Sequence, residues 1–241
     1  MNRLVLMLLR NLHHIPGKFS KLCHYAKHTQ NYPETEKWAH IQSIMQLAVG
    51  AGNVQLQVTG LENIPQEGGF MLYGNHQGMF DVLAIAATCP RPLGIVYKKE
   101  IKNVPLLKQI YACTNSFAMD REDVRQSLTV IQKVTEEVKN GRAYVIFPEG
   151  TRSRSGNHLL EFHGGSFRCA VKAKCPVIPM AFVDSWRVLD QKGSKPLTVQ
   201  LHYLPPIPYE EYETLKPAQL AQLVKERIEA TIAANLPASE A

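Results

Sequence analysis

Residues 70–87 read FMLYGNHQGMFDVLAIAA. The apolar run that ends at Gly74 is typical of a buried strand, and a second apolar run, opened by Asp81, is typical of a helix. His76 lies in the polar turn between them. From there, Asp81 can fold back and accept a hydrogen bond from one imidazole nitrogen, which leaves the other nitrogen as a base with a fixed tautomer. A second interpretation stays open, in which Asp81 only caps the helix.

A second polar turn follows another strand-like run. Residues 143–146 read AYVI, and residues 147–154 read FPEGTRSR. Gly150 permits a tight turn with exposed backbone N–H groups, and the planar guanidinium of Arg152 suits a phosphate. A His–Asp pair and an arginine-glycine turn, each placed after a strand, together indicate a transfer site for a phosphate-bearing substrate.

At these residues the sequence resembles the 1-acylglycerol-3-phosphate acyltransferases and their glycerolipid acyltransferase relatives. The family's His-x-x-x-x-Asp block matches His76 to Asp81, and its Phe-Pro-Glu-Gly-Thr-Arg-Ser block is present unchanged at 147–153. Two further blocks, an apolar run ending in Arg and a Pro-rich apolar strand, match 117–121 and 176–180. The resemblance extends over residues 54–205, with Gly78 standing where many relatives carry Ser.

The resemblance implies acyl transfer from acyl-CoA or acyl-carrier protein to the free hydroxyl of 1-acyl-sn-glycerol-3-phosphate, giving phosphatidic acid without a cofactor. His76 is then the general base and Asp81 orients it. Glu149 is expected to brace Arg152 or a backbone amide. A solvated charge cluster is the alternative interpretation of the lysine pair at 98–99. The residues that the resemblance places around the acceptor phosphate are Lys98, Lys99, Arg121, Glu149, Gly150, Thr151 and Arg152.

Two other functions remain open at this point. A relative that acylates glycerol-3-phosphate or another lysophospholipid would share the chemistry and differ only in its acceptor pocket. A membrane-docked anion-binding protein without catalysis belongs to a different class, and the intact first and third blocks argue against it. No serine or cysteine stands beside His76 in the first block as a nucleophile, so we expect direct transfer without an acyl-enzyme.

Composition favours anionic partners. The formal net charge is +6, and 45% of the residues are hydrophobic, as in a globular domain. Basic residues are not interleaved with aromatic ones, so no nucleic-acid partner is expected. The five cysteines form no C-x-x-C pair, which favours a reducing compartment. No histidine pair has a carboxylate or cysteine at ligand spacing, so we expect no metal site.

The first thirty residues hold five basic residues and no acidic one. The apolar run at 4–9 is too short to span a bilayer, which needs about 20 residues. No small-residue cleavage site follows it, which disfavours a signal peptide. Apolar residues edged by cations resemble an interfacial helix on an anionic membrane surface, and a helix packed on the core is the alternative. We therefore expect peripheral or monotopic attachment to the cytoplasmic face of a membrane.

Strand and helix patterns alternate along the chain. This predicts an α/β fold with a single mixed-sheet acyltransferase domain, flanked by helices and preceded by an N-terminal membrane-docking segment. The expected divisions are 1–52 for the N-terminal helical segment, 53–208 for the catalytic domain and 209–241 for a C-terminal helix packed on it. An amphipathic helix is expected at 122–140, with Val124, Leu128, Ile131, Val134 and Val138 on its apolar face.

Overall fold

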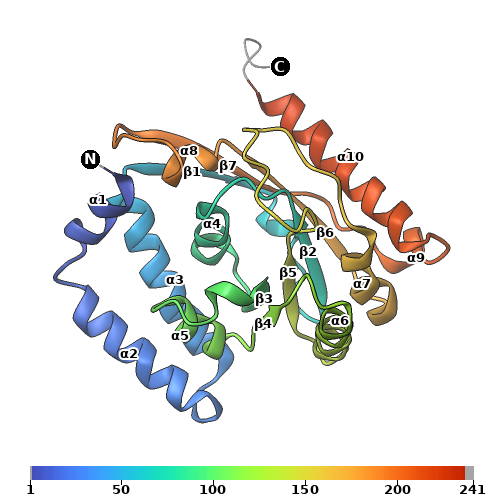
Figure 1. The fold of residues 1–241 in the computed structure, drawn as a ribbon, viewed down its shortest axis with the longest axis horizontal. Helices are drawn as coiled ribbons and strands as arrows, with labels where there is room; N and C mark the ends of the chain where they lie inside the picture. Colours follow the sequence, from blue (N-terminus) through green and yellow to red (C-terminus); the bar gives the residue numbers. More distant parts are fainter. Residues whose placement is uncertain (1, 237–241) are drawn as a thin grey trace.

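In the computed structural model, which describes residues 2–236, seven strands form one mixed sheet in the order β1-β7-β6-β2-β5-β3-β4 (Figure 1). The strands are β1 (Val54–Thr59), β2 (Phe70–Gly74), β3 (Leu93–Lys98), β4 (Phe117–Met119), β5 (Ala143–Ile146), β6 (Val177–Val183) and β7 (Leu197–Tyr203). Strand β2 lies at the centre of the sheet, between β6 and β5, and pairs parallel with both.

Five neighbouring strands, from β6 through β4, run parallel to one another. Strand β7 pairs antiparallel with β6, and β1 pairs parallel with β7, so the last two strands run the opposite way. The carboxyl ends of the five parallel strands therefore share one edge of the sheet. Each of the four sequence blocks either includes part of one of these strands or closely follows one. The topology therefore brings the blocks toward the same edge of the sheet.

Helices cover both faces of the sheet (Figure 1). One face carries α1 (Arg3–Arg10), α2 (Ile15–Lys27), α3 (Glu34–Ala51), α4 (Phe80–Thr88) and α5 (Leu107–Cys113). The other carries α6 (Val124–Lys139), α7 (Arg168–Ala173) and α10 (Pro217–Asn235). Two short helices, α8 (Trp186–Leu189) and α9 (Tyr209–Tyr212), follow β6 and β7. The 3₁₀ turns are η1 (Thr29–Asn31), η2 (Leu61–Asn63), η3 (Lys99–Ile101) and η4 (Gly164–Phe167).

Strand β2 shows why its sequence is a continuous apolar run. Phe70 and Leu72 belong to the core on the α3–α4 face, whereas Met71 and Tyr73 belong to the core on the α6–α10 face. All four side chains are fully buried, because a central strand in a sheet covered on both faces has no side open to water. The apolar pattern thus places β2, and the turn that follows it, in the middle of the molecule.

The amino-terminal segment forms two helices and not one. Leu6 and Met7 of α1 are buried, and so are Leu22 and Tyr25 of α2. Trp38 of α3 belongs to the same core as the strands, and its indole N–H donates to the carbonyl of Cys89 at 3.0 Å. The helices of residues 3–51 therefore pack on the sheet as part of the same unit. Within residues 2–236, no helix combines the length and the hydropathy that crossing a bilayer needs.

The amphipathic helix predicted at 122–140 is confirmed as α6 (Val124–Lys139), but the first two residues of its apolar face are not buried. Val124 is 70% exposed and Leu128 is 47% exposed. The buried side of α6 begins at Val130 and continues through Ile131, Val134 and Val138. The first turns of α6 extend beyond the part of the helix that packs on the sheet, so the regular spacing continues outside the core.

Arg3 joins α1 to the rest of the chain. Arg3 is only 5% exposed. Its guanidinium donates to the carbonyls of Gly52 at 2.7 Å, Lys195 at 3.0 Å and Val188 at 3.1 Å. These acceptors lie at the end of α3, before β7 and in α8, so one side chain holds three separate segments together. The sequence counts Arg3 among the cations of a membrane-facing helix, but the structure places it in the interior.

We expect Arg3→Leu to lower the free energy of unfolding by about 2 to 4 kcal/mol, because a hydrogen bond to a charged group is worth about 1.5 to 3 kcal/mol and three carbonyls, two of them buried, lose their donor. Urea unfolding measures the change, with Arg125→Leu as the control, because Arg125 is exposed in α6 and its side chain makes no hydrogen bond or ion pair with residues 2–236. A loss for Arg3→Leu no larger than that of the control would mean that this contact does not hold α1 in place.

Candidate active site

The turn after β2 is built by two carboxamide side chains. Asn75 and Gln77 are each 1% exposed. The side chain of Asn75 donates to the carbonyl of Phe182 at 3.0 Å and accepts from the N–H of the same residue at 2.8 Å. Asn75 thereby continues the pairing of β2 with β6 for one residue beyond the last backbone pair. These two hydrogen bonds fix the point at which the chain leaves the sheet, directly before His76.

His76 and Asp81 lie in contact. The Nδ1 atom of His76 is 2.7 Å from Oδ2 of Asp81, a carboxylate with no exposed surface. The same oxygen accepts from the backbone N–H groups of Gln77 at 2.8 Å and Gly78 at 3.0 Å, and the other oxygen accepts from the hydroxyl of Ser185. Asp81 does lie in the first turn of α4, as a capping residue would, but its oxygens contact the histidine and the turn.

The geometry defines what the imidazole can do. A carboxylate on Nδ1 requires the proton to be on that nitrogen, which leaves Nε2 as an acceptor. Nε2 has no hydrogen-bond partner among residues 2–236, and the His76 side chain is 19% exposed. The ring stacks on Phe147 with centroids 4.2 Å apart and planes at 24°. Asp81 therefore holds one edge of the imidazole and Phe147 packs on one face, while Nε2 has no partner in the described part of the chain.

Glu149 holds the backbone of His76. It is 3% exposed, and its Oε1 accepts from the N–H of His76 at 2.6 Å while Oε2 accepts from the N–H of Leu160 at 3.0 Å. The carbonyl of His76 in turn accepts from the N–H of Ser153 at 2.8 Å. Burial raises the pKa of the Glu149 carboxyl, and the two amide hydrogen bonds oppose that rise. Glu149 braces a backbone amide and neither Arg152 nor an anion.

The arginine-glycine turn passes beside the first block. Gly150 has φ +69°, the left-handed region that favours glycine, and its N–H donates to Phe147 at 3.1 Å. Thr151 is exposed. Arg152, 30% exposed, pairs with Asp190 at 3.4 Å. Asp190 lies against Gly78, where an added Cβ would come within 3.1 Å of the carboxylate. Arg152 is thus near the His76 turn, and the lack of a side chain at Gly78 leaves room for Asp190, the partner of Arg152.

The other residues predicted to surround the acceptor phosphate, Lys98, Lys99 and Arg121, lie farther along the same edge of the sheet. Lys98 pairs with Glu100 at 3.2 Å and Lys99 with Asp120 at 2.5 Å. Arg121 is exposed and makes no ion pair with any residue between 2 and 236. Lys98 ends β3, Lys99 follows it and Arg121 follows β4. Strand β4 is three strand spacings from β2, or about 14 Å. The structure therefore divides the predicted phosphate-binding residues into two groups. Arg152 lies beside the His–Asp pair, and Lys98, Lys99 and Arg121 lie toward β4.

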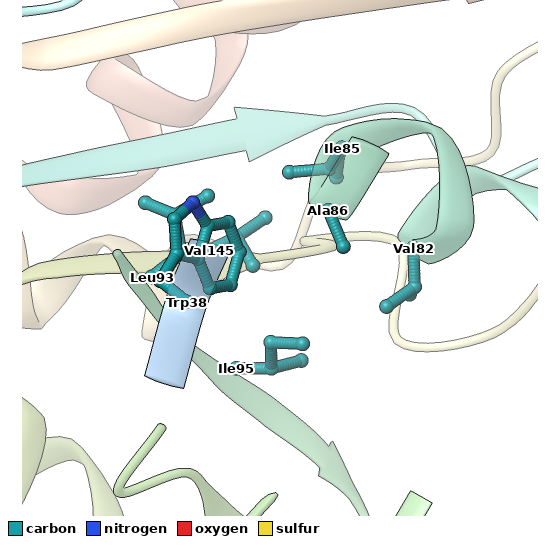
Figure 2. Close-up of a pocket in the computed structure, with 7 residues that line it drawn as sticks. All are labelled: Trp38, Val82, Ile85, Ala86, Leu93, Ile95 and Val145. Atoms are coloured by element: carbon teal, nitrogen blue, oxygen red, sulfur yellow. The ribbon is translucent and has the colours of Figure 1, made fainter. Parts of the chain in front are cut away.

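A small cavity lies beneath α4, away from these polar groups (Figure 2). Its lining comes from α3, α4, β3 and β5 and is apolar throughout. It offers no partner to a charged ligand, so we assign it to core packing. The residues are Trp38, Val82, Ile85, Ala86, Leu93, Ile95 and Val145. No three His, Cys, Asp or Glu side chains within residues 2–236 are grouped so that they could hold a metal ion.

Sequence reasoning missed the polar residues that support the pair. Asn75 and Gln77 were visible as carboxamides on either side of His76, which is a usable signal. Ser185 and Asn157 gave none, because Ser185 is 104 residues from Asp81 and Asn157 is 80 residues from Gln77 along the chain. Only the fold brings these side chains together.

Comparison with known proteins gives a consistent result. The family model described as Acyltransferase matches residues 55–183. The 1-acyl-sn-glycerol-3-phosphate acyltransferase of Salmonella typhimurium is 30% identical over 69% of this chain and 68% of its own length. That of Borreliella burgdorferi is 23% identical over 78% and 76%. That of Saccharomyces cerevisiae is 29% identical over 62% of this chain, and the match spans 48% of its length.

The fold has a solved counterpart. The crystal structure of the 1-acyl-sn-glycerophosphate acyltransferase from Thermotoga maritima superposes with a TM-score of 0.77 and 20% sequence identity, over 96% of this chain and 95% of that one. At this level of identity the likeness concerns the fold. It confirms the predicted α/β class, with a mixed sheet and flanking helices.

The raised pKa of Glu149 has a consequence for stability. A carboxyl whose pKa is higher in the folded protein than in the unfolded chain, where it is about 4.3, contributes most stability below that value and progressively less as the pH rises through the folded pKa. Gln at this position does not titrate. We therefore expect the free energy of unfolding of the wild type, minus that of Glu149→Gln, to fall between pH 4 and pH 7.

Urea unfolding at several pH values measures this difference, and Glu161→Gln, which removes an 84% exposed carboxylate from the same loop, is the control. A difference that increases with pH would show that the two amides stabilise the charged carboxylate by more than burial destabilises it.

Proposed function

The chain belongs to the acyltransferase family that includes the 1-acylglycerol-3-phosphate acyltransferases, and on that premise we propose that it transfers an acyl group from a thioester to the free hydroxyl of 1-acyl-sn-glycerol-3-phosphate. The product is phosphatidic acid, and the donor is acyl-CoA or acyl-carrier protein. The observation that carries the proposal is the pair of His76 and Asp81, with one nitrogen held and the other free.

The proposed chemistry needs one base. Nε2 of His76 accepts the proton of the acceptor hydroxyl as the oxygen attacks the thioester carbonyl. Asp81 stabilises the imidazolium that forms, and the thiolate leaves with the same proton when the tetrahedral intermediate collapses. No Ser or Cys side chain of residues 2–236 hydrogen bonds to the His76 ring, which supports direct transfer over an acyl-enzyme. The Gly150 N–H is bonded to the Phe147 carbonyl, so the backbone N–H groups of Thr151 and Arg152 are the ones proposed to face the developing oxyanion.

The basic groups are proposed to hold the acceptor phosphate at the strand edge. Arg152 is beside the His–Asp pair and lies in the turn with Gly150 and Thr151, and its planar fork suits a phosphate. Its partner Asp190 is 39% exposed, and such a pair is easily exchanged for a stronger anion. Lys98, Lys99 and Arg121 are proposed to approach from the β4 side. Glu149 is proposed to act on the same site only through the backbone of His76.

Helix α1 supports a membrane-docking role. Leu6 and Met7 pack inward, so the helix is held on the core, and its opposite side is apolar as well. Leu8 is 53% exposed, Leu9 57% and Leu12 65%. Solvent-exposed leucines grouped on one helix and its end are typical of a surface that contacts lipid. We propose that this side enters the cytoplasmic face of an anionic membrane, with Arg10, Lys18, Lys21 and Lys27 as its cations and the interior Arg3 as its anchor.

A panel of acceptors and donors with the purified protein tests the proposed reaction. Formation of phosphatidic acid from lysophosphatidic acid supports it. A clear preference for glycerol-3-phosphate or another lysophospholipid would retain the chemistry and replace the acceptor. No turnover of any acyl thioester, with binding of phosphate-bearing lipids, would identify a non-catalytic anion-binding protein.

We expect His76→Ala to lower kcat by about 10² to 10⁴, the usual contribution of a general base. Circular dichroism establishes that the variant is folded, and His24→Ala, at an exposed position of α2, controls for the loss of an imidazole. A folded His76→Ala protein with near-normal turnover would exclude His76 as the base.

Arg152→Ala is expected to weaken use of the acceptor severely, since a charge-assisted contact is worth about 1.5 to 3 kcal/mol and a misplaced acceptor loses up to about 10²-fold in the chemical step. The KM for the thioester should change little, and Arg152→Lys should restore only part of the activity because it lacks the planar fork. Steady-state kinetics with each substrate varied in turn, and Arg125→Ala as control, decide the matter. Equal losses for both substrates would indicate that Arg152 only braces its loop through Asp190.

Exposed leucines test the membrane surface better than truncation, because removing residues 1–30 would also remove the buried Leu22 and Tyr25. We expect the triple variant Leu8→Gln, Leu9→Gln, Leu12→Gln to lose most of its co-sedimentation with anionic vesicles. The matched control is Val124→Gln with Leu128→Gln, which removes exposed apolar side chains elsewhere. Unchanged sedimentation of the triple variant would show that this side of α1 does not contact lipid.

A further inference from the structure

The chain turns sharply at Asp184, directly after β6. Asp184 has φ +64°, in the left-handed region, which Asp enters more readily than most residues other than glycine because its short side chain forms local hydrogen bonds. Its N–H donates to Oδ1 of Asn157 at 2.9 Å, its Oδ1 accepts from Nδ2 of Asn157 at 3.0 Å, and its Oδ2 accepts from Arg187 at 3.0 Å. These three side-chain contacts fix the conformation of the turn.

The turn delivers Ser185 to the His–Asp pair. Ser185 has no exposed surface, and its N–H donates to Oε1 of Gln77 at 2.9 Å. Its hydroxyl lies 3.1 Å from that same oxygen and in contact with Oδ1 of Asp81. The hydroxyl has one proton to donate. Because Asp81 carries a charge and Gln77 already receives the Ser185 N–H, the stronger bond is the one to Asp81.

The two oxygens of Asp81 have unequal partners. Oδ2 accepts from His76 and from two backbone N–H groups, whereas Oδ1 accepts from Ser185 alone among residues 2–236. Without that hydroxyl, Oδ1 of Asp81 would be buried without a donor, and the negative charge of the carboxylate would be less stabilised. A less stabilised carboxylate attracts the proton on Nδ1 more strongly and favours the imidazolium form of His76.

We propose that Ser185 is a positioning residue of the reaction, which donates its hydroxyl to Asp81 and thereby keeps Nε2 of His76 free of a proton at the pH of turnover. The proposal rests on the proposed function, in which Nε2 is the base. It also gives the left-handed turn at Asp184 a role, since the residue that follows this turn directs both its N–H and its hydroxyl to the first block.

Other charged groups face the pair from the surrounding elements. Glu149 lies beneath the backbone of His76, and His163 lies beside Gly150. Asp184 pairs with Arg187, and Asp190 pairs with Arg152 near Gly78. None of them contacts the carboxylate of Asp81, so replacing the Ser185 hydroxyl leaves all of them in place. A change in the titration of His76 would then report on Ser185.

The experiment measures kcat/KM against pH for the wild type, Ser185→Cys and Ser185→Ala, a series that weakens and then removes the donor. The midpoint of the acid limb should move to higher pH in the order Ser, Cys, Ala, by about 0.5 to 1 pH unit in total, because one pH unit corresponds to a tenfold change in proton affinity. The KM for each substrate should stay nearly constant. Ser185→Thr, which keeps the hydroxyl, should restore the wild-type midpoint.

Thr135→Val is the matched control, since Thr135 is 2% exposed in α6 and donates its hydroxyl only to its own helix. It should change stability without moving the midpoint. A Ser185→Ala protein with lower thermal stability and an unmoved midpoint would overturn the proposal and leave a structural role. If Ser185→Ala does not fold, the comparison of Ser with Cys carries the same test.

A second measurement separates this proposal from the proposed function. Diethyl pyrocarbonate modifies unprotonated imidazole, and peptide mass spectrometry gives its rate at His76 as a function of pH without any substrate. The midpoint of that rate should shift upward in Ser185→Ala, whether or not the wild type transfers acyl groups. An equal midpoint in the two proteins would refute the role of Ser185, and absence of acyl transfer in the wild type would refute only the function.

Discussion

The buried carboxylate of Asp81 is the constraint on which the rest of the site depends. It has no exposed surface, so its charge is stable only because it accepts from four donors: the His76 ring, two backbone N–H groups of the turn and the Ser185 hydroxyl. Its position in the first turn of α4 adds the favourable end of the helix dipole. Because the donors come from the β2–α4 turn and from the end of β6, the carboxylate also joins two strands at the edge where they open.

A parallel sheet makes this arrangement possible. Strand β2 is central, so the segments that follow β5 and β6 pass on either side of its turn. The segment after β5 holds the peptide of His76 at both ends, through Glu149 and the N–H of Ser153, and stacks Phe147 on the ring. The segment after β6 supplies Ser185 and, through α8, the partner of Arg152. The segments that follow β2, β5 and β6 therefore together fix the position of a single imidazole.

The sequence predicts the parts of this arrangement that depend on local pattern. The apolar run of β2, the polar turn and the short separation of His76 from Asp81 all predict a strand, a turn and a helix with the two side chains able to meet. The alternation of strands and helices predicts the α/β class. These signals are local because hydrophobic periodicity and turn chemistry act over a few residues.

The rest depends on contacts between distant segments. Ser185 is 104 residues from Asp81, and Arg3 is 185 residues from Val188, so no local pattern marks either contact. Arg152 pairs with Asp190 and not with the neighbouring Glu149, because the turn carries the two side chains to different segments. Val124 and Leu128 continue the periodicity of α6 into solvent, since periodicity states which side of a helix is apolar but not where the core ends.

We expect Asp81 to hold the proton on Nδ1 of His76 and to leave Nε2 unprotonated, as the proposed base. Nitrogen-15 NMR of protein labelled in histidine, with the His76 signals assigned by their absence in His76→Ala, reads the tautomer of this ring directly. At pH 8 we expect a protonated Nδ1 and an unprotonated Nε2, the tautomer on which the proposed mechanism depends. A ring protonated on Nε2, or one that averages between the two tautomers as free histidine does, would contradict it.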